Sequence, residues 1–254
     1  EETGENLVSV SIGVNARKQM EGELGARSSA EKEVDWNSHD VRYILEVWIG
    51  GKERVSRSVM TAGDMDSPVN FNIRLIPGEY DFLCWADIVS TSPEAGGCYD
   101  AEDLRAVKIK GDYVGADVNR DAFAWRERGS FSSDFSLSAT LVRPFAKLVL
   151  ADNKTSNSGG ETAVALTFGK GVFMDTYNVM TGEASSSGES SPRPTYPPTK
   201  SSDTFLAWDY FFVPASGRMS FKVSVGGGAE KQVDDIPLKR NTITRVIGNF
   251  VINN

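Results

Sequence analysis

The residue types that most often carry catalysis or bind metals are scarce in this chain. It contains one histidine, His39, and two cysteines, Cys84 and Cys98. A site with several His or Cys ligands therefore cannot be built from it. A lone loop histidine is more often solvated than a general base. No nucleophile elbow or phosphate-binding loop motif occurs. This scarcity predicts that the protein is not an enzyme and has neither a cofactor nor a metal site.

One acidic stretch resembles the start of a calcium-binding loop. Asp117, Asn119 and Asp121 have the spacing of the first three ligands. Position six of the loop is Ala122, where a glycine is needed, and position twelve is Arg128, where a glutamate is needed. The pattern therefore fails as a calcium site. Capping of a short helix by Asp121 is the simpler interpretation.

The two cysteines leave two interpretations open. Cys84 shares the apolar face of a predicted strand with Phe82 and Ala86, and Cys98 follows a pair of glycines in a predicted loop. A Cys84–Cys98 disulfide would suit an extracytoplasmic protein and would stabilise it by about 2–4 kcal/mol. A buried, free Cys84 suits the sequence equally well.

The composition is that of a globular protein with an acidic surface. The 254 residues include 27 Lys and Arg against 35 Asp and Glu, which gives a net charge of -8, and 40% are apolar. Such a chain can bury a large core, so bulk disorder is excluded. The negative charge argues against nucleic acid and anionic membranes as partners.

Alternation of apolar and polar residues dominates the chain and predicts half-buried strands. Many such runs separated by turn signals are typical of a β-sandwich. A Pro77–Gly78 turn predicts that the third and fourth runs form a hairpin. Helix signals are confined to residues 100–104 and 121–128. The predicted strands cover residues 7–14, 41–49, 69–75, 80–86, 135–141, 145–150, 164–168, 219–225 and 242–252.

The chain divides near the Arg143–Pro144 pair, because a proline within a strand-like stretch marks a bend or an edge. We expect an N-terminal β-sandwich domain over residues 1–138 and a C-terminal one over residues 139–254. A Ser- and Pro-rich segment at 185–202 predicts an exposed loop within the second domain. A second long, accessible loop is expected over residues 17–38.

Four segments of the chain carry a resemblance to a known family. They span nearly the whole sequence, and the most specific are the Arg-Pro-x-Ala-Lys-Leu and the Arg-Asn-x-x-Thr-x-Val-x-Gly-Asn patterns. The chain resembles the fimbrillin-like surface proteins, or type V pilins, of Bacteroides-type bacteria. The four segments are residues 80–87, 121–123, 143–148 and 237–249.

The resemblance implies an all-β fold of two tandem transthyretin-like β-sandwich domains, with one or two short helices. It also implies a structural subunit of outer-membrane-associated fimbriae on the cell surface, whose partners are other pilin subunits. Membrane attachment would depend on a lipid anchor upstream of Glu1. In this family an arginine-specific protease removes the first strand, and a donor strand of another subunit fills the vacated groove.

Several residues match that mechanism. Arg17 and Arg27 are the candidate processing sites in the loop after the first strand. The removable strand would bury Val8, Val10, Ile12 and Val14. The last predicted strand is a candidate donor or a neighbour of the groove, through Ile243, Val246, Ile247, Phe250 and Val251.

A non-polymerising surface adhesin or glycan-binding lipoprotein is the alternative to the pilin interpretation. Five Trp and seven Tyr residues could build a sugar-binding platform, and the Ser- and Pro-rich loop suits a surface protein. Trp48, Trp85 and Trp208, however, lie inside predicted strands, where aromatic side chains usually fill the core. The receptor or glycan of such an adhesin is not identifiable from the sequence.

Overall fold

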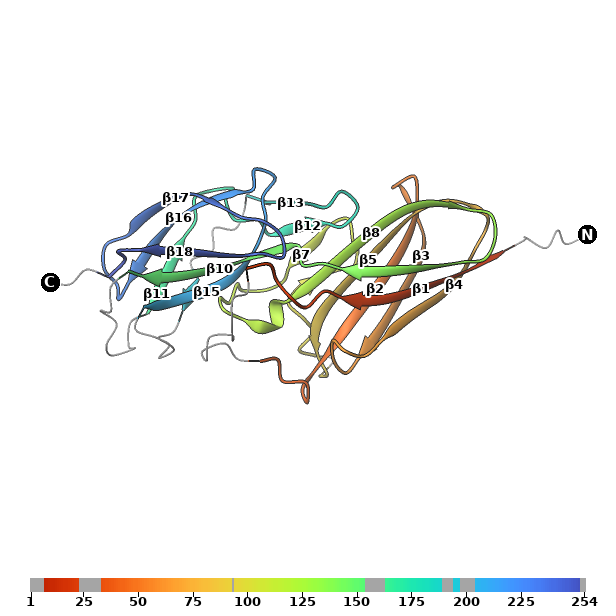
Figure 1. Ribbon diagram of the computed structural model, residues 1–254, viewed down its shortest axis with the longest axis horizontal. Helices are drawn as coiled ribbons and strands as arrows, with labels where there is room; N and C mark the ends of the chain where they lie inside the picture. The colour runs from red at the N-terminus through yellow and green to blue at the C-terminus, as the bar shows by residue number, and fades with distance from the viewer. Residues whose placement is uncertain are drawn as a thin grey trace, which may run out of the picture.

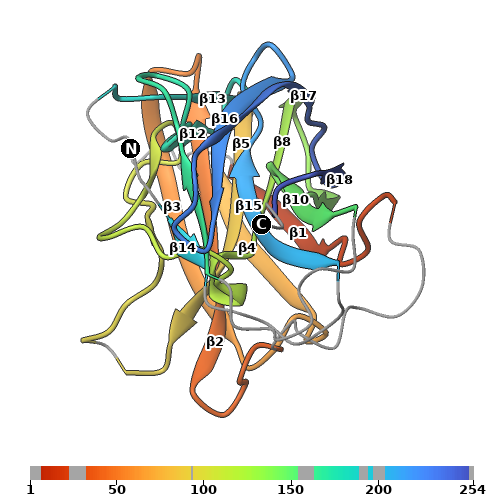
Figure 2. The same ribbon diagram turned by 90° about the vertical axis from the view of Figure 1, so that its left-hand side faces the viewer.

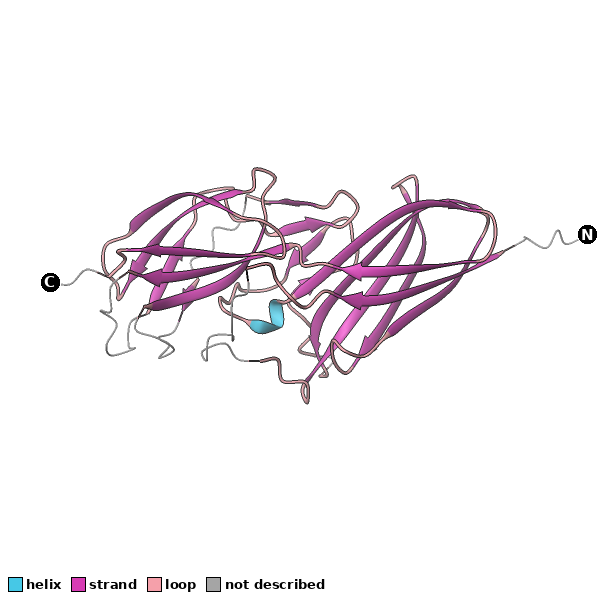
Figure 3. Ribbon diagram, viewed as in Figure 1, coloured by secondary structure: helices cyan, strands magenta, loops and turns pink. Residues whose placement is uncertain are grey.

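The structure, a computed structural model, is an elongated arrangement of strands in two lobes (Figure 1). Within the described residues the single helical element is the 3-10 turn η1 (Val118–Arg120), as Figure 3 shows. The predicted all-β class is confirmed. No helix among these residues is long and apolar enough to span a membrane. The structure describes residues 7–22, 33–92, 94–153, 163–188, 194–196 and 204–251.

The N-terminal lobe is a sandwich of two sheets. The first has the strand order β4 (Val69–Leu75), β1 (Val8–Ala16), β9 (Phe135–Leu141). The second has the order β3 (Glu53–Ala62), β2 (His39–Ile49), β5 (Gly78–Ser90), β8 (Ala122–Phe131). Alternate side chains of both sheets fill the space between them, which is the reason for the period-two pattern.

The C-terminal lobe repeats this plan with shorter strands. One sheet has the order β15 (Phe205–Phe212), β10 (Phe145–Asp152), β18 (Ile243–Gly248). The other has the order β14 (Thr195–Tyr196), β11 (Val164–Thr167), β16 (Arg218–Val225), β17 (Lys231–Pro237). A second apolar core, which includes Leu148, Phe211 and Phe221, lies between the two sheets.

A third core joins the two lobes. Figure 2 shows the molecule viewed down its long axis. A small sheet with strands from both parts of the chain contributes to it, in the order β13 (Glu183–Ser185), β12 (Thr176–Asn178), β7 (Val107–Ile109), β6 (Tyr99–Asp100). Trp48, Trp85 and Trp208 are all buried in this core, as expected for aromatic side chains inside strands.

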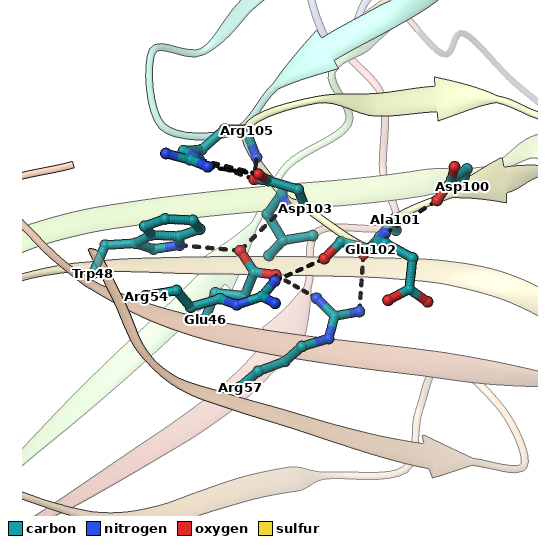
Figure 4. A network of polar contacts seen from close by, with 10 residues as sticks. Glu46, Trp48, Arg54, Arg57, Asp100, Ala101, Glu102, Asp103 and Arg105 are labelled. Carbon is teal, nitrogen blue, oxygen red and sulfur yellow. Dashed lines mark hydrogen bonds and ion pairs between the residues drawn. The ribbon is translucent and has the colours of Figure 1, made fainter. Parts of the chain in front are cut away.

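A buried carboxylate fixes the turn after β6 against the N-terminal sandwich (Figure 4). Glu46 of β2 is fully buried and accepts hydrogen bonds from Trp48 Nε1 (3.0 Å), the Leu104 amide (3.2 Å), Arg54 (2.8 Å) and Arg57. The two arginines also donate to main-chain carbonyls of the turn. Because a buried charge is tolerated only when it is paired, this network holds the turn in place and closes one side of the third core.

The predicted hairpin of residues 69–75 and 80–86 is wrong. Residues 69–75 form β4, which pairs with β1, whereas β5 pairs with β2 and β8 in the opposite sheet. The Pro77–Gly78 turn carries the chain from one sheet to the other, and the Tyr80 hydroxyl donates to the Ile76 carbonyl (2.6 Å) across it. The two strands therefore lie in opposite sheets of the same sandwich, and their apolar faces pack into the same core.

Both predicted helices are also wrong. Residues 100–104 begin at the end of β6 and continue as turns, and residues 122–131 form β8, which pairs with β5 along most of its length. The Arg and Glu residues of β8 favour a helix locally, but pairing with β5 overrides that weak preference. Asp121 starts no α-helix: it is the C-cap residue of the 3-10 turn η1, and its side chain pairs with Arg143.

The strand that precedes the Arg143–Pro144 pair belongs wholly to the N-terminal lobe. β9 pairs with β1 up to Leu141, so the predicted division between residues 138 and 139 falls within β9. β10 begins at Phe145 in the C-terminal lobe. Within the Ser- and Pro-rich segment, Thr195 and Tyr196 form β14, while residues 189–193 and 197–202 lie outside the described ranges.

Both cysteines are free in the structure. Cys84 lies in the core of the N-terminal sandwich, whereas Cys98 packs against the third core. Burial raises the pKa of the Cys84 thiol far above its ordinary value and that of Cys98 to about 12. The two residues lie in different cores, an arrangement that favours the free-thiol interpretation.

This burial predicts the reactivity of the thiols. We expect no alkylation of Cys84 by iodoacetamide at pH 8 in the native protein, and alkylation of both cysteines after unfolding, because the thiolate is the reacting form. Peptide mass mapping without reduction checks this. A Cys84–Cys98 linked peptide, or rapid native labelling of Cys84, would contradict the prediction.

Candidate functional site

Strand β1 lies in the middle of its sheet, which makes it the element on which the candidate site is built. It pairs antiparallel with β4 from Val8–Leu75 to Val14–Val69, and parallel with β9 up to Ala16–Leu141. Loss of a central strand would leave the N–H and C=O groups of both neighbours facing a gap one strand wide. The gap would accept any extended chain that restores both ladders.

The side chains of β1 alternate between the core and the outer face. The residues predicted from the sequence to belong to the removable strand, Val8, Val10, Ile12 and Val14, are all buried in the N-terminal core, and Ile12 is 0% exposed. Ser11 points the other way and exchanges hydrogen bonds with Asn70 on β4. β1 thus supplies one complete row of the core, and its removal stays a prediction.

Arg17 directly follows β1 and is exposed, but the backbone around it is not free. Its amide donates to the Leu141 carbonyl (2.8 Å), and its own carbonyl accepts from Arg143 (3.3 Å). A protease that binds its substrate as an extended chain would have to break these bonds first. Arg27, the other candidate processing site, lies outside the described residues.

Arg143 forms a buried junction at the point where the two lobes meet. Its guanidinium makes two hydrogen bonds to the Asp121 carboxylate, both 2.7 Å long, and lies 4.5 Å from the centre of the Phe123 ring. It also donates to the side-chain oxygen of Asn241 (3.3 Å). Arg143 and Asn241 belong to the two most specific sequence patterns. Their contact was not predicted, although a charged residue beside an apolar run signals a paired, buried role.

The last strand is placed away from the first. β18 pairs in parallel with β10, not with β4 or β9, so it is no neighbour of the gap that β1 would leave. Ile247 is 67% exposed, while Ile243 and Val246 are half-buried. Its role as a donor strand stays a prediction.

The residues after β18 are anchored rather than free. Phe250 is buried in the C-terminal core and Val251 packs beside it. Both of their amides donate to the buried Asp152 carboxylate at 2.7 Å. A donor role for this end of the chain would therefore require release from Asp152.

A cavity of about 410 Å³ lies beside η1. Its wall combines aromatic side chains with carboxylates and one histidine, and the side-chain oxygen of Asn119 is buried there without a hydrogen-bond partner. Among the described residues no group of three His, Cys, Asp or Glu side chains could hold a metal. The polar and aromatic wall includes Asp35, His39, Asp117, Tyr196, Phe205 and Trp208.

Three solved structures from Bacteroides and Parabacteroides species share the fold. A Bacteroides thetaiotaomicron protein described among "putative polysaccharide binding proteins (DUF1812)" has a TM-score of 0.55 at 10% identity, over 91% of this chain and 80% of its own. A "putative adhesin" from Bacteroides ovatus has a TM-score of 0.54 at 12% identity, over 96% and 92%. A "putative cell adhesion protein" from Parabacteroides distasonis has a TM-score of 0.53 at 9% identity, over 95% and 89%. At identities this low, the structural similarity establishes a common fold alone.

Sequence comparison identifies the family directly. No curated protein is significantly similar to the chain. One family pattern matches residues 2–254. The chain therefore belongs to the family described as "Family of unknown function (DUF6562)".

Proposed function

We propose that the protein is a structural subunit of a cell-surface fimbria, held at the outer membrane, and that it assembles with other subunits by replacement of its first strand. The observation that carries the proposal is the central position of β1, which pairs on both sides and supplies one complete row of the N-terminal core. The shared fold with proteins described as adhesins supports a surface role. The resemblance to type V pilins supports assembly.

The geometry sets what a replacement strand must provide. It must run antiparallel to β4 and parallel to β9, and it must place apolar side chains at the positions of Val10 and Ile12. Addition of such a strand restores the hydrogen bonds and covers the core in one step, as in other cases of β-strand addition. The candidate donor, the segment from Ile243 to Val251 of a second copy, carries five apolar residues, but no two of them are two positions apart, so it meets this requirement only in composition.

Limited digestion with an arginine-specific protease tests the proposal. Because the peptide bond after Arg17 is tied down on both sides, we expect the first cut after Arg27, so Arg27→Gln should slow processing and Arg17→Gln should not. Mass spectrometry locates the cut, and a gel of unheated samples detects oligomers. Release of the first strand with a ladder of heat-labile oligomers is expected. Cleavage that leaves a stable monomer would overturn the proposal.

The cavity beside η1 favours a second candidate function, that of a non-polymerising adhesin. A cavity wall that combines aromatic side chains with carboxylates suits a carbohydrate or another polar ligand. Glycan-array binding by the intact monomer that is lost in Asn119→Ala would support this function. Retention of binding by that variant would point away from the cavity.

A further inference from the structure

The segment Lys18–Gly22, which follows β1 and Arg17, crosses from the N-terminal lobe to the C-terminal lobe (Figure 1). In Figure 1 the red chain continues from β1 toward β10 and β18. There it meets β18: Glu21 and Thr242 form a parallel bridge. We call Lys18–Gly22 the crossing segment. It belongs to none of the five sheets described above, yet it is hydrogen-bonded along its length.

Main-chain groups of the crossing segment carry most of its contacts. Arg143 donates to the Lys18 carbonyl (2.6 Å), and the side-chain amide of Asn241 donates to the Gln19 carbonyl (3.0 Å). The Glu21 amide donates to the Asn241 carbonyl (2.8 Å), and the Glu21 carbonyl accepts from the Ile243 amide (2.9 Å). Contacts of this kind recognise an extended peptide whatever its side chains are.

Two positions of the crossing segment are nonetheless selective. Met20 is only 5% exposed and is part of the core that joins the lobes. Gly22 has a φ of 84°, and a Cβ there would lie 3.4 Å from the Ile243 carbonyl oxygen. An L-residue is strained at this φ, so glycine is favoured. The site therefore selects an apolar residue two positions before a glycine.

The backbone conformation and the side chain of Asn241 both suit binding of the crossing segment. Its φ is 53°, in the left-handed region that Asn tolerates better than most residues. Its amide donates to the Phe145 carbonyl (2.7 Å), so its main chain is fixed at the start of β10. Its side chain then lies between Arg143 and the Gln19 carbonyl, accepting from one and donating to the other. Every polar group of Asn241 is engaged when the crossing segment is bound.

The side chains on the outer rim add little. Lys239 donates to the Glu21 carboxylate (2.7 Å) and holds the pKa of Glu21 below its ordinary value. Both side chains are well exposed, so this pair contributes little to affinity. Specificity thus resides in the apolar residue, the glycine and the main chain.

We propose that Arg143, Asn241 and the free edge of β18 form a second peptide-binding site, separate from the β1 groove, which takes an extended peptide with an apolar residue two positions before a glycine. In the intact chain the crossing segment occupies this site. The occupant after its departure is the same segment of a second copy, because that copy carries the matching Met-Glu-Gly sequence. The site does not depend on strand replacement at β1.

The proposal is tested on the full, uncut chain by hydrogen exchange read by NMR. Met20→Asp should expel the crossing segment and speed exchange of the Glu21 and Ile243 amides at least tenfold. The matched control is Gln19→Asp, which adds the same charge at an exposed neighbouring side chain and should change neither rate. The Ile12 amide should stay protected in both variants. Unchanged Glu21 and Ile243 rates in Met20→Asp would overturn the proposal.

A peptide then tests the emptied site directly. A synthetic peptide with the sequence of Arg17–Gly22 is added to the Met20→Asp chain at about millimolar concentration, near the effective concentration of a tethered segment. We expect it to restore protection of the Ile243 amide, and the same peptide with Asp in place of Met to have no effect. If the Ile12 amide also loses protection in Met20→Asp, the peptides are added to the Gly22→Val chain instead. Equal effects of the two peptides, or no effect of either, would refute the site.

Discussion

Replacement of Arg143 by alanine is expected to lower the free energy of unfolding by about 3–5 kcal/mol, the usual cost of breaking a buried ion pair. Arg143 is 5% exposed, and its guanidinium neutralises an Asp121 carboxylate that is itself only 15% exposed. Without it that carboxylate is left without its cation, the Lys18 carbonyl loses a donor, and the face of Phe123 loses its cationic neighbour. Urea denaturation followed by tryptophan fluorescence measures the effect.

A second arginine provides the matched control. Arg128 makes a similar two-pronged contact with the Glu79 carboxylate, but its side chain is 63% exposed and that of Glu79 is 54% exposed. Water screens such a pair, so Arg128→Ala should cost at most about 1 kcal/mol. Equal losses in the two variants would mean that burial of the Arg143 pair carries no particular weight.

Local alternation was enough to locate nine of the eighteen strands in the described residues. β1, β2, β4, β5, β9, β10, β11, β16 and β18 all overlap runs predicted from the sequence. The reason is that each of these strands has a face in an apolar core, and a half-buried strand must alternate. The buried row of Val8 to Val14, on which the candidate site depends, follows from the same rule.

Pairing between strands was not predictable in this way. Alternation shows that β4 and β5 each bury one face, but it is the same whether two strands lie side by side or in opposite sheets. The short turn at Pro77–Gly78 favours a hairpin, yet β4 pairs with β1, which lies about sixty residues earlier in the sequence. A choice of this kind depends on the packing of the whole sandwich rather than on the turn.

The contacts of Arg143 with Asp121 and Asn241 could not be predicted from the sequence for a related reason. Its partners Asp121 and Asn241 are far from it in sequence, and each has a simpler local interpretation as a helix cap or a turn residue. Only the folded chain brings them to one point beneath the crossing segment. The sequence resemblance singled out the patterns that contain Arg143 and Asn241 but not the contact between them.

Replacement of Ile12 by aspartate should be the most damaging single change in β1. Each fully buried Val or Ile side chain contributes about 1.5–3 kcal/mol, so the four core residues of β1 together contribute about 6–12 kcal/mol. That range is comparable to the whole net stability of a typical domain, about 5–15 kcal/mol. The N-terminal sandwich therefore cannot keep the groove empty. An unpaired carboxylate at Ile12, which is 0% exposed, should cost about 4 kcal/mol or more.

Ser11→Asp is the control, because it places the same charge on the same strand but on the outer face, where Ser11 is only half-buried. We expect Ser11→Asp to change the thermal midpoint little and Ile12→Asp to lower it by many degrees, as read by tryptophan fluorescence. If the groove needs an apolar strand, a peptide with the sequence of residues 7–16 should restore the midpoint of Ile12→Asp, while the same peptide with aspartate at position 12 should not. Equal midpoints for the two variants would show that the buried row of β1 is dispensable, and strand replacement would then lose its driving force.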